Sequence, residues 1–256
     1  MKKIAFALIC AICSTTAAAQ EHLVISLSSQ RVAITSNFIG EHLVLFGTVQ
    51  HGPNAVERKG GYDIVVTVTG PKQTFRTRRK GRVLGVWVNV DSREFVDVPS
   101  YLAVLSNRPV GEIADREVLR RLQIGLDNFI LRQHIGPDFA DTVPDDPFRV
   151  AFVQLQSEHG LYAQNSEAVT FLTPEVFRAS ISLPANVPTG DYNVDVKLFA
   201  NGKMIAHTNA GIDVTKVGFE EYVADAARDQ GLLYGLATML MALTTGWIAS
   251  VLFRRD

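Results

Sequence analysis

The chain has 256 residues, of which 47% are hydrophobic and 20% are charged, with 25 lysine and arginine residues against 26 aspartate and glutamate residues. This length allows one or two folded domains of roughly 100–200 residues, and the composition excludes collagen, a coiled coil and a fully disordered chain. A net charge of -1 gives no general attraction to phosphate backbones, so we expect no nucleic-acid partner.

Residues 1–19 have the pattern of a secretory signal peptide. Two lysines precede an uninterrupted apolar run of ten residues from Ile4 to Cys13, and small residues in Ala-x-Ala spacing lead to a predicted cleavage after Ala19. The mature chain then begins at Gln20. An uncleaved anchor is the alternative, but such a short run cannot span a hydrocarbon core of about 30 Å.

Both cysteines of the chain, Cys10 and Cys13, lie inside this predicted signal peptide. Their spacing is that of redox and zinc motifs, but cleavage would remove them. The mature chain is therefore expected to contain no disulfide bond and no cysteine ligand for a metal.

Residues 20–109 are typical of a β-sandwich unit, which the signal peptide would export to the periplasm. Short runs rich in β-branched and aromatic residues alternate with turn signals such as Gly60-Gly61 and Gly70-Pro71. Strands are predicted at 23–27, 32–34, 43–49, 62–69, 83–90 and 101–106. Short strands at this spacing indicate an immunoglobulin-like β-sandwich.

Basic residues are concentrated between Lys72 and Arg82. If residues 73–82 form a strand, side chains alternate with a period of two, and one face would carry Arg76, Arg78, Lys80 and Arg82. Like charges on one face repel unless acids or an anion oppose them. The candidate residues for binding an anion or a partner are Lys72, Arg76, Arg78, Lys80 and Arg82.

Three interpretations of this basic stretch remain open. It is a solvated edge strand whose charges block edge-to-edge pairing, a surface for an anionic solute or lipid headgroup, or a docking patch for an acidic partner.

Residues 110–160 are predicted to form a helical insert and linker. Apolar residues recur at helical spacing in 112–134, which predicts an amphipathic helix ending before Gly136-Pro137. Asp146-Pro147 is a favourable N-cap and first helical position, so 147–159 is predicted as a second helix, with a strand as the alternative. An acidic loop between them contains Asp138, Asp141, Asp145 and Asp146. It lacks the regular spacing of calcium-binding loops, and a solvated linker explains it better.

Residues 161–217 return to a β pattern and are predicted as a second β unit. Strands are expected at 177–183, 192–199 and 204–214, the last two joined by a two-residue turn at Asn201-Gly202. Residues 218–230 are predicted as a juxtamembrane helix.

The predicted fold class is mainly β with a helical insert. It comprises one or two immunoglobulin-like β-sandwich units, an amphipathic helix pair between them and one C-terminal transmembrane helix. The sequence leaves open whether the two β regions form one domain or two.

Residues 231–253 form a run of 23 residues without a charged side chain. At about 1.5 Å per residue such a helix is roughly 34 Å long, enough to cross a bilayer. Arg254 and Arg255 follow at once, so the positive-inside rule places the tail 254–256 in the cytoplasm. Together with the export signal, this predicts a single-pass inner-membrane protein with a large periplasmic domain. A buried hairpin of a soluble domain is the alternative, but a globular helix rarely lacks a polar face.

Small residues recur every four positions along this predicted membrane helix, at Thr238, Ala242, Gly246 and Ser250. Small residues let two helix backbones approach closely in lipid. The spacing predicts packing against a membrane-protein partner or a second copy of the chain. Because such spacing also arises by chance in spans rich in alanine and glycine, a plain anchor is the alternative.

Several short motifs occur in a particular order along the mature chain. They are Ser36-Asn37-Phe38-Ile39-Gly40, Leu45-Phe46-Gly47, Gly70-Pro71, Gly85-Val86-Trp87-Val88-Asn89, Val98-Pro99-Ser100-Tyr101 and the segment from Leu183 to Tyr192. With the signal peptide and the terminal helix, the chain resembles the Alph_Pro_TM family of transmembrane proteins of Alphaproteobacteria over nearly its whole mature length. The resemblance implies a membrane location. The family carries no established activity, so it supplies no catalytic residue.

The sequence contains no spacing typical of a catalytic or metal centre. None of the six histidines lies in H-x-H or H-E-x-x-H spacing, and the chain has no G-x-S-x-G elbow, P-loop or G-x-G-x-x-G motif. We therefore expect no cofactor, no metal and no enzymatic activity. An enzyme whose site is assembled only by folding is the alternative.

These features favour a non-enzymatic interaction or accessory protein that works beside another membrane protein. The expected partners are the lipid bilayer and, through the membrane helix, a membrane protein or a second copy. The alternative function is a periplasmic binding module for an anionic solute or lipid headgroup.

Overall fold

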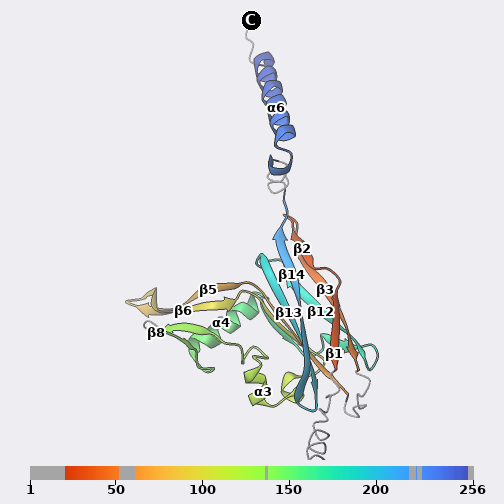
Figure 1. Cartoon of the computed structure of the whole chain (residues 1–256). Coiled ribbons are helices and arrows are strands. Elements are labelled where there is room, and N and C mark those ends of the chain that lie inside the picture. The colour runs from red at the N-terminus through yellow and green to blue at the C-terminus, as the bar shows by residue number, and fades with distance from the viewer. Residues whose placement is uncertain (1–20, 52–60, 136–137, 219–222, 224–226, 253–256) are drawn as a thin grey trace, which may run out of the picture.

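The computed structural model describes residues 21–51, 61–135, 138–218, 223 and 227–252. The predicted signal peptide 1–19, the predicted tail 254–256 and most of the predicted juxtamembrane helix 218–230 lie outside the described residues. Within the described part, two sheets form a sandwich, a third sheet projects from it, and one long helix lies apart (Figure 1).

Both sheets of the sandwich combine strands from the two β-rich regions. The four-stranded sheet has the order β1 (His22–Leu27), β3 (Gly40–Gln50), β12 (Val176–Pro184) and β11 (Val169–Phe171). The six-stranded sheet has the order β10 (Tyr162–Asn165), β7 (Leu102–Ser106), β4 (Asp63–Thr69), β13 (Gly190–Ala200), β14 (Lys203–Lys216) and β2 (Arg31–Ile34).

This topology answers the question that the sequence left open, whether the β regions 20–109 and 161–217 form one domain or two. Strand β3 pairs on one side with β12, and β4 pairs on one side with β13. Each region therefore supplies partners that the other region needs for its central strands, and the two regions form one sandwich. The predicted mainly β fold class is confirmed.

Apolar side chains alternate along the strands and meet between the two sheets. The main buried cluster includes Phe177, Ile181, Val194, Val196 and Leu198. The strands predicted at 177–183, 192–199 and 204–214 are confirmed. The predicted turn between the last two is confirmed as well, because Asn201 and Gly202 both have positive φ, at 49° and 77°.

The third sheet has the order β5 (Lys72–Val83), β6 (Val86–Pro99), β8 (Arg132–Ile135) and β9 (Asp138–Asp141). Strands β5 and β6 form a long antiparallel hairpin, here called the arm (residues 72–99), which extends away from the sandwich (Figure 1). The strand predicted at 83–90 is wrong, because the chain reverses at Leu84-Gly85 inside it.

The insert contains three helices: α2 (Val110–Ile113), α3 (Arg116–Arg121) and α4 (Pro147–Glu158). The helix predicted over 112–134 is corrected, because it breaks after Arg121, where Gln123 and Gly125 take positive φ of 54° and 100°. The apolar residues that suggested the longer helix are buried all the same, among them Leu119, Ile124 and Phe129.

The second predicted helix, 147–159, is confirmed as α4. The side chain of Asp146 accepts hydrogen bonds from the backbone N–H groups of Phe148 and Arg149, and Pro147 occupies the first turn. Asp146 therefore is the N-cap that the sequence predicted.

Helix α6 (Gly231–Leu252) is long and apolar enough to cross a membrane. Its Gly231–Ser250 stretch has a mean hydropathy of 1.5, and none of that stretch is buried against the rest of the chain. A buried hairpin of a soluble domain, the alternative interpretation, does not fit a helix that is exposed along this length.

Candidate functional site

The turn of the arm carries an apolar side chain in an unfavourable backbone conformation. Leu84 and Gly85 are the two central residues of the β5–β6 turn, and both have positive φ, at 51° and 87°. Two-residue hairpin turns of this kind favour asparagine or aspartate followed by glycine. A leucine in the left-handed region costs roughly 1–2 kcal/mol, yet the Leu84 side chain is 100% exposed and gains no packing within the fold.

The end of the arm exposes valine side chains on one face, and Trp87 lies opposite Arg82 on the other face. We call this region the apolar tip, and its exposed side chains are Val83, Leu84, Val86, Trp87, Val88 and Val90. Trp87 is 67% exposed. Contiguous exposed apolar groups of this kind mark surfaces that contact another molecule.

The predicted basic face is formed on β5, next to the apolar tip. Arg76, Arg78, Lys80 and Arg82 are exposed and alternate with the less exposed Phe75, Thr77 and Gly81. These four residues differ in their ion-pair and hydrogen-bond partners, and the partners decide which charges are available to bind another molecule.

Two of the four basic residues are engaged within the hairpin. Arg76 forms an ion pair with Glu94 at 2.5 Å, and Nε of Arg82 contacts the carbonyl oxygen of Gly85 at 3.4 Å. Among the residues that the structure describes, Arg78 and Lys80 have no ion pair. The charges of Arg78 and Lys80 therefore lie unpaired between the ion pair of Arg76 and the apolar tip.

Two neighbouring cations are separated from that face. Lys72 lies at the start of β5, where a register shift between Gln73 and Phe75 interrupts the alternation, and it lines a cavity against the sandwich. Arg79 points to the other face, where it lies 3.6 Å from Asp91 and its guanidinium sits 5.9 Å from the centre of the Phe148 ring.

An aromatic cluster fixes the root of the arm. Phe152 of α4 packs against Phe75 and Phe95 of the arm, with ring centres 5.3 and 5.5 Å apart. Tyr162 packs edge-on against Phe152 and donates a hydrogen bond to the carbonyl oxygen of Pro99 at 2.6 Å. Burial raises the pKa of the Tyr162 hydroxyl above its ordinary value, so it remains a donor.

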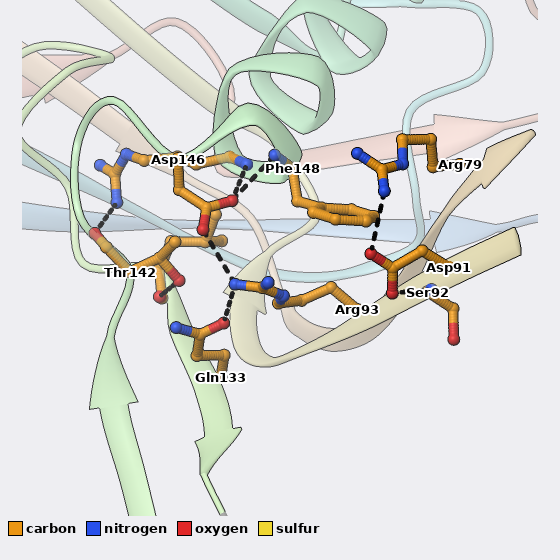
Figure 2. Close-up of polar contacts among 10 residues, drawn as sticks. Arg79, Asp91, Ser92, Arg93, Gln133, Thr142, Asp146 and Phe148 are labelled. Carbon is orange, nitrogen blue, oxygen red and sulfur yellow. Dashed lines mark hydrogen bonds and ion pairs between the residues drawn. The ribbon is translucent and has the colours of Figure 1, made fainter.

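A polar network fixes the same root from the side of β8 (Figure 2). One guanidinium nitrogen of Arg93 donates to Asp146 and to Gln133, both at 2.8 Å. The guanidinium also lies 4.9 Å from the centre of the Phe148 ring. Because Asp146 caps α4 as well, arm, sheet and helix are tied together, and the apolar tip is held out on a well-packed base.

The acidic loop has structural roles in this arrangement. Asp141 accepts a hydrogen bond from the backbone N–H of Leu131 at 2.8 Å, and Asp146 is the helix cap. Among the described residues, no group of three or more histidine, cysteine, aspartate or glutamate side chains is placed to hold a metal ion.

The small residues of α6 lie on one side of the helix by their spacing of four. Thr238, Ala242, Gly246 and Ser250 are all exposed. A Cβ added at Gly246 would meet no atom within 4 Å, so the described part of this chain leaves room for another helix there.

The sequence pattern predicts the basic face, whereas the apolar tip was not predicted. The available signal was the run Val83-Leu84-Gly85-Val86-Trp87, in which a glycine interrupts a hydrophobic stretch too apolar for an exposed strand. The predicted strand 83–90 placed the whole run on one strand, so the turn was not predicted.

An apolar helix of membrane-spanning length joined to a β-rich folded domain defines a single-pass membrane protein. The chain belongs to the family described as "Putative transmembrane protein (Alph_Pro_TM)", whose model matches residues 22–255. The resemblance drawn from the sequence motifs is confirmed.

Among solved structures, the chain is similar to AggA, the major subunit of aggregative adherence fimbriae type I from Escherichia coli. The match covers 77% of this chain and 96% of AggA, with 12% identity and a TM-score of 0.27. A likeness at this TM-score carries no assignment of fold or function. No curated protein matches this chain at a significant level.

Proposed function

We propose that this protein is a non-enzymatic accessory protein of the inner membrane, with its β-rich domain in the periplasm and its arm in contact with another membrane protein. The observation that carries the proposal is the apolar tip, where Leu84 and Trp87 are exposed at the end of a firmly rooted hairpin. Burying a leucine side chain contributes about 1.5–3 kcal/mol. A partner that covers the tip would recover this free energy and offset the strain at Leu84.

The periplasmic orientation is supported by the predicted signal peptide and by the arginines after α6. Because both cysteines of the chain lie in the predicted signal peptide, single introduced cysteines report the topology of the cleaved protein. We expect Leu172→Cys to react with a membrane-impermeant maleimide once the outer membrane is opened, and Asp256→Cys to react only after the inner membrane is disrupted. Labelling in the reverse order would place the β-rich domain in the cytoplasm.

Removing the apolar tip is expected to remove the partner without unfolding the protein. In the variant Leu84→Ser with Trp87→Ser, two exposed side chains are replaced by small polar ones. The thermal midpoint should therefore stay within about 2 °C, as for surface substitutions that change stability little. Capture of a partner by crosslinking in intact membranes should fall at least tenfold, since each lost apolar contact is worth more than a factor of ten.

A matched control is Leu172→Ser, because Leu172 is 52% exposed and lies beside β11, away from the arm. Its crosslinking pattern should equal that of the wild type. Equal capture by the tip variant and the wild type would contradict the proposed role of the arm.

The second candidate function is binding of an anionic lipid headgroup, and the basic side chains beside the tip favour it. Arg78 and Lys80 have no ion pair in the described part of the chain, and Trp87 lies opposite Arg82 in the same hairpin. Tryptophan with lysine or arginine is the combination found at membrane interfaces. Arg78→Gln with Lys80→Gln should then abolish binding to vesicles containing phosphatidylglycerol, whereas a protein partner would be lost mainly with the tip variant.

The small-residue face of α6 provides a second expected contact with the partner or with another copy. A leucine at position 246 would hold a neighbouring helix away by about the width of a side chain, while the added apolar surface leaves insertion unaffected. We expect Gly246→Leu to keep expression and topology but to lose an α6 crosslink. Leu240→Ile and Ile248→Leu, which lie on the opposite side of the helix at 100° per residue, should keep it. Identical crosslinking by all three variants would mean that α6 is a plain anchor.

A further inference from the structure

A cavity of about 310 Å³ lies between the root of the arm, the segment 122–132 and the outer face of the six-stranded sheet. It is separate from the apolar tip. Its volume is at the lower end of the range of about 300–1,000 Å³ found for small-molecule sites. The cavity could hold a solute of a few heavy atoms, and not a polymer.

The floor of the cavity is formed by polar side chains, although the neighbouring part of the same sheet face is apolar. Beneath α2 and α3, this face carries Val65 and Phe199, which are fully buried. Further along the same strands, it carries Thr67 of β4 opposite Asp195 of β13, together with Lys197. The apolar part of this face is buried because the short helices α2 and α3 cover it. That cover gives no reason for the buried polar side chains at the floor of the cavity.

Two polar atoms of the floor are buried without a hydrogen-bond partner among the described residues. They are Oγ1 of Thr67 and Oδ1 of Asp195. Lys197, which is only 8% exposed, donates to the other carboxylate oxygen, Oδ2 of Asp195. Buried polar groups in native proteins are nearly always hydrogen-bonded, so Oδ1 of Asp195 and the Thr67 hydroxyl call for a partner other than the described residues.

The rim of the cavity carries two cationic side chains and two residues with a strained backbone. Lys72 and Arg132 line it, and Arg132 lies 3.8 Å from the exposed Asp97. Asp97 and Gln123 both have φ of 54°, in the left-handed region that residues with a side chain rarely adopt. Strained backbone of this kind gathers at ligand-binding sites.

We infer that this cavity binds a small zwitterion, a solute of amino-acid size that carries one ammonium and one acidic group. The ammonium donates to Oδ1 of Asp195 and to the Thr67 hydroxyl on the floor. The acidic group faces Lys72 and Arg132 on the rim, and Phe129 supplies an apolar wall between the two ends. A lone anion leaves Oδ1 of Asp195 without a donor, and a lone amine leaves Lys72, which has no ion pair among the described residues, without an acidic partner.

The test uses the full-length protein in detergent micelles and isothermal titration calorimetry. Glycine, β-alanine, serine and glutamate are the zwitterionic probes. Acetate and methylamine represent the separate halves of glycine. Each probe is titrated to about 10 mM, a range that covers weak but specific binding. We expect saturable binding of at least one zwitterion, at least tenfold tighter than that of acetate or methylamine.

Two variants locate the site. Asp195→Asn should weaken binding at least tenfold, because it removes the charge that faces the ammonium. Thr67→Val should weaken binding severalfold while the thermal midpoint stays the same or rises, since the substitution removes a buried hydroxyl without a partner. The control is Ser100→Ala, which removes another buried and unpartnered hydroxyl outside the cavity lining and should leave binding unchanged.

Three results would overturn the inference. Acetate that binds as tightly as the zwitterions would show an anion site, and the absence of binding by every probe would show a cavity that holds only water. Unchanged affinity in both the Thr67→Val and the Asp195→Asn variants would show a site elsewhere. Leu84→Ser should not alter this binding, so the outcome is independent of the proposed function of the arm.

Discussion

Replacing Arg149 by leucine is expected to lower the free energy of unfolding by about 3–5 kcal/mol, the range found when a buried charge network is broken. Arg149 lies on α4 and is only 4% exposed. Its guanidinium donates to the carbonyl oxygens of Phe129 at 2.6 Å, Asp127 at 3.3 Å and Thr142 at 3.3 Å. Leucine fills much of the space but leaves these carbonyl oxygens without a donor, at about 1–3 kcal/mol for each one that stays buried.

The charge of Arg149 is part of the reason for the large effect. Burial lowers the pKa of the guanidinium, and the nearby carboxylates of Asp141 and Asp127 oppose that shift. The ordinary pKa of arginine lies far above neutral pH, so the group stays protonated at neutral pH and keeps all its donors. A lysine cannot reproduce the fork of donors, and Arg149→Lys should recover only part of the lost stability.

Urea unfolding of the full-length protein in detergent measures this effect. The matched control is Val150→Ala on the same helix, because Val150 is 53% exposed and should change stability by no more than about 0.5 kcal/mol. If Arg149→Leu unfolds at the same urea concentration as the control, water satisfies the freed carbonyls and the segment around Phe129 does not depend on Arg149.

A methyl group at position 47 is expected to destabilise the sandwich by about 1–3 kcal/mol, the usual cost of overpacking a core. Gly47 of β3 lies directly opposite Phe177 of β12 in the four-stranded sheet. A Cβ at Gly47 would lie 2.2 Å from Cζ of Phe177, and the Phe177 ring is fully buried. The ring cannot move aside without displacing other core residues.

Whether Gly47→Ala lowers or raises stability distinguishes overpacking from the intrinsic preference of a strand for alanine over glycine. Alanine is ordinarily favoured over glycine inside a strand by roughly 0.5–1 kcal/mol. Gly211→Ala on β14 is the control, because its Cβ would meet nothing closer than 3.9 Å and the substitution should be neutral or stabilising. Adding Phe177→Leu to Gly47→Ala should recover part of the loss, since residues in contact do not behave additively. A stabilising Gly47→Ala would contradict the packing described here.

The sequence determined the features that depend on local pattern. The run of 23 residues without a charged side chain predicted α6, because it is long enough to cross a bilayer. The Asp146-Pro147 pair predicted the start of α4, because an N-cap acts within one turn of the helix. Alternating apolar residues predicted the strands of the second β region, because the two faces of a strand meet different environments whatever its partners are.

Only the tertiary structure decided which strands pair and where chain segments are strained. Gly47 and Phe177 are 130 positions apart in the sequence, and nothing local to either one indicates that they are neighbours. The single sandwich follows from such pairings. The break after Arg121 has the same origin: Ile124 and Phe129 reach buried positions only if the helix ends, and the gain from burial outweighs the preference for helical spacing.

The candidate sites also differ in whether the sequence or only the tertiary structure reveals them. Periodicity alone placed four basic residues on one face of β5, because a strand alternates regardless of its surroundings. For the apolar tip, the sequence shows only a hydrophobic run interrupted by Gly85. The exposure of that run could not be predicted, because it depends on how far the arm extends beyond the aromatic cluster at its root. The polar floor of the cavity, with Thr67 and Asp195, depends on the pairing of β4 with β13 and on the cover formed by the insert. Distances across sheets and between layers arise only when the whole chain is folded.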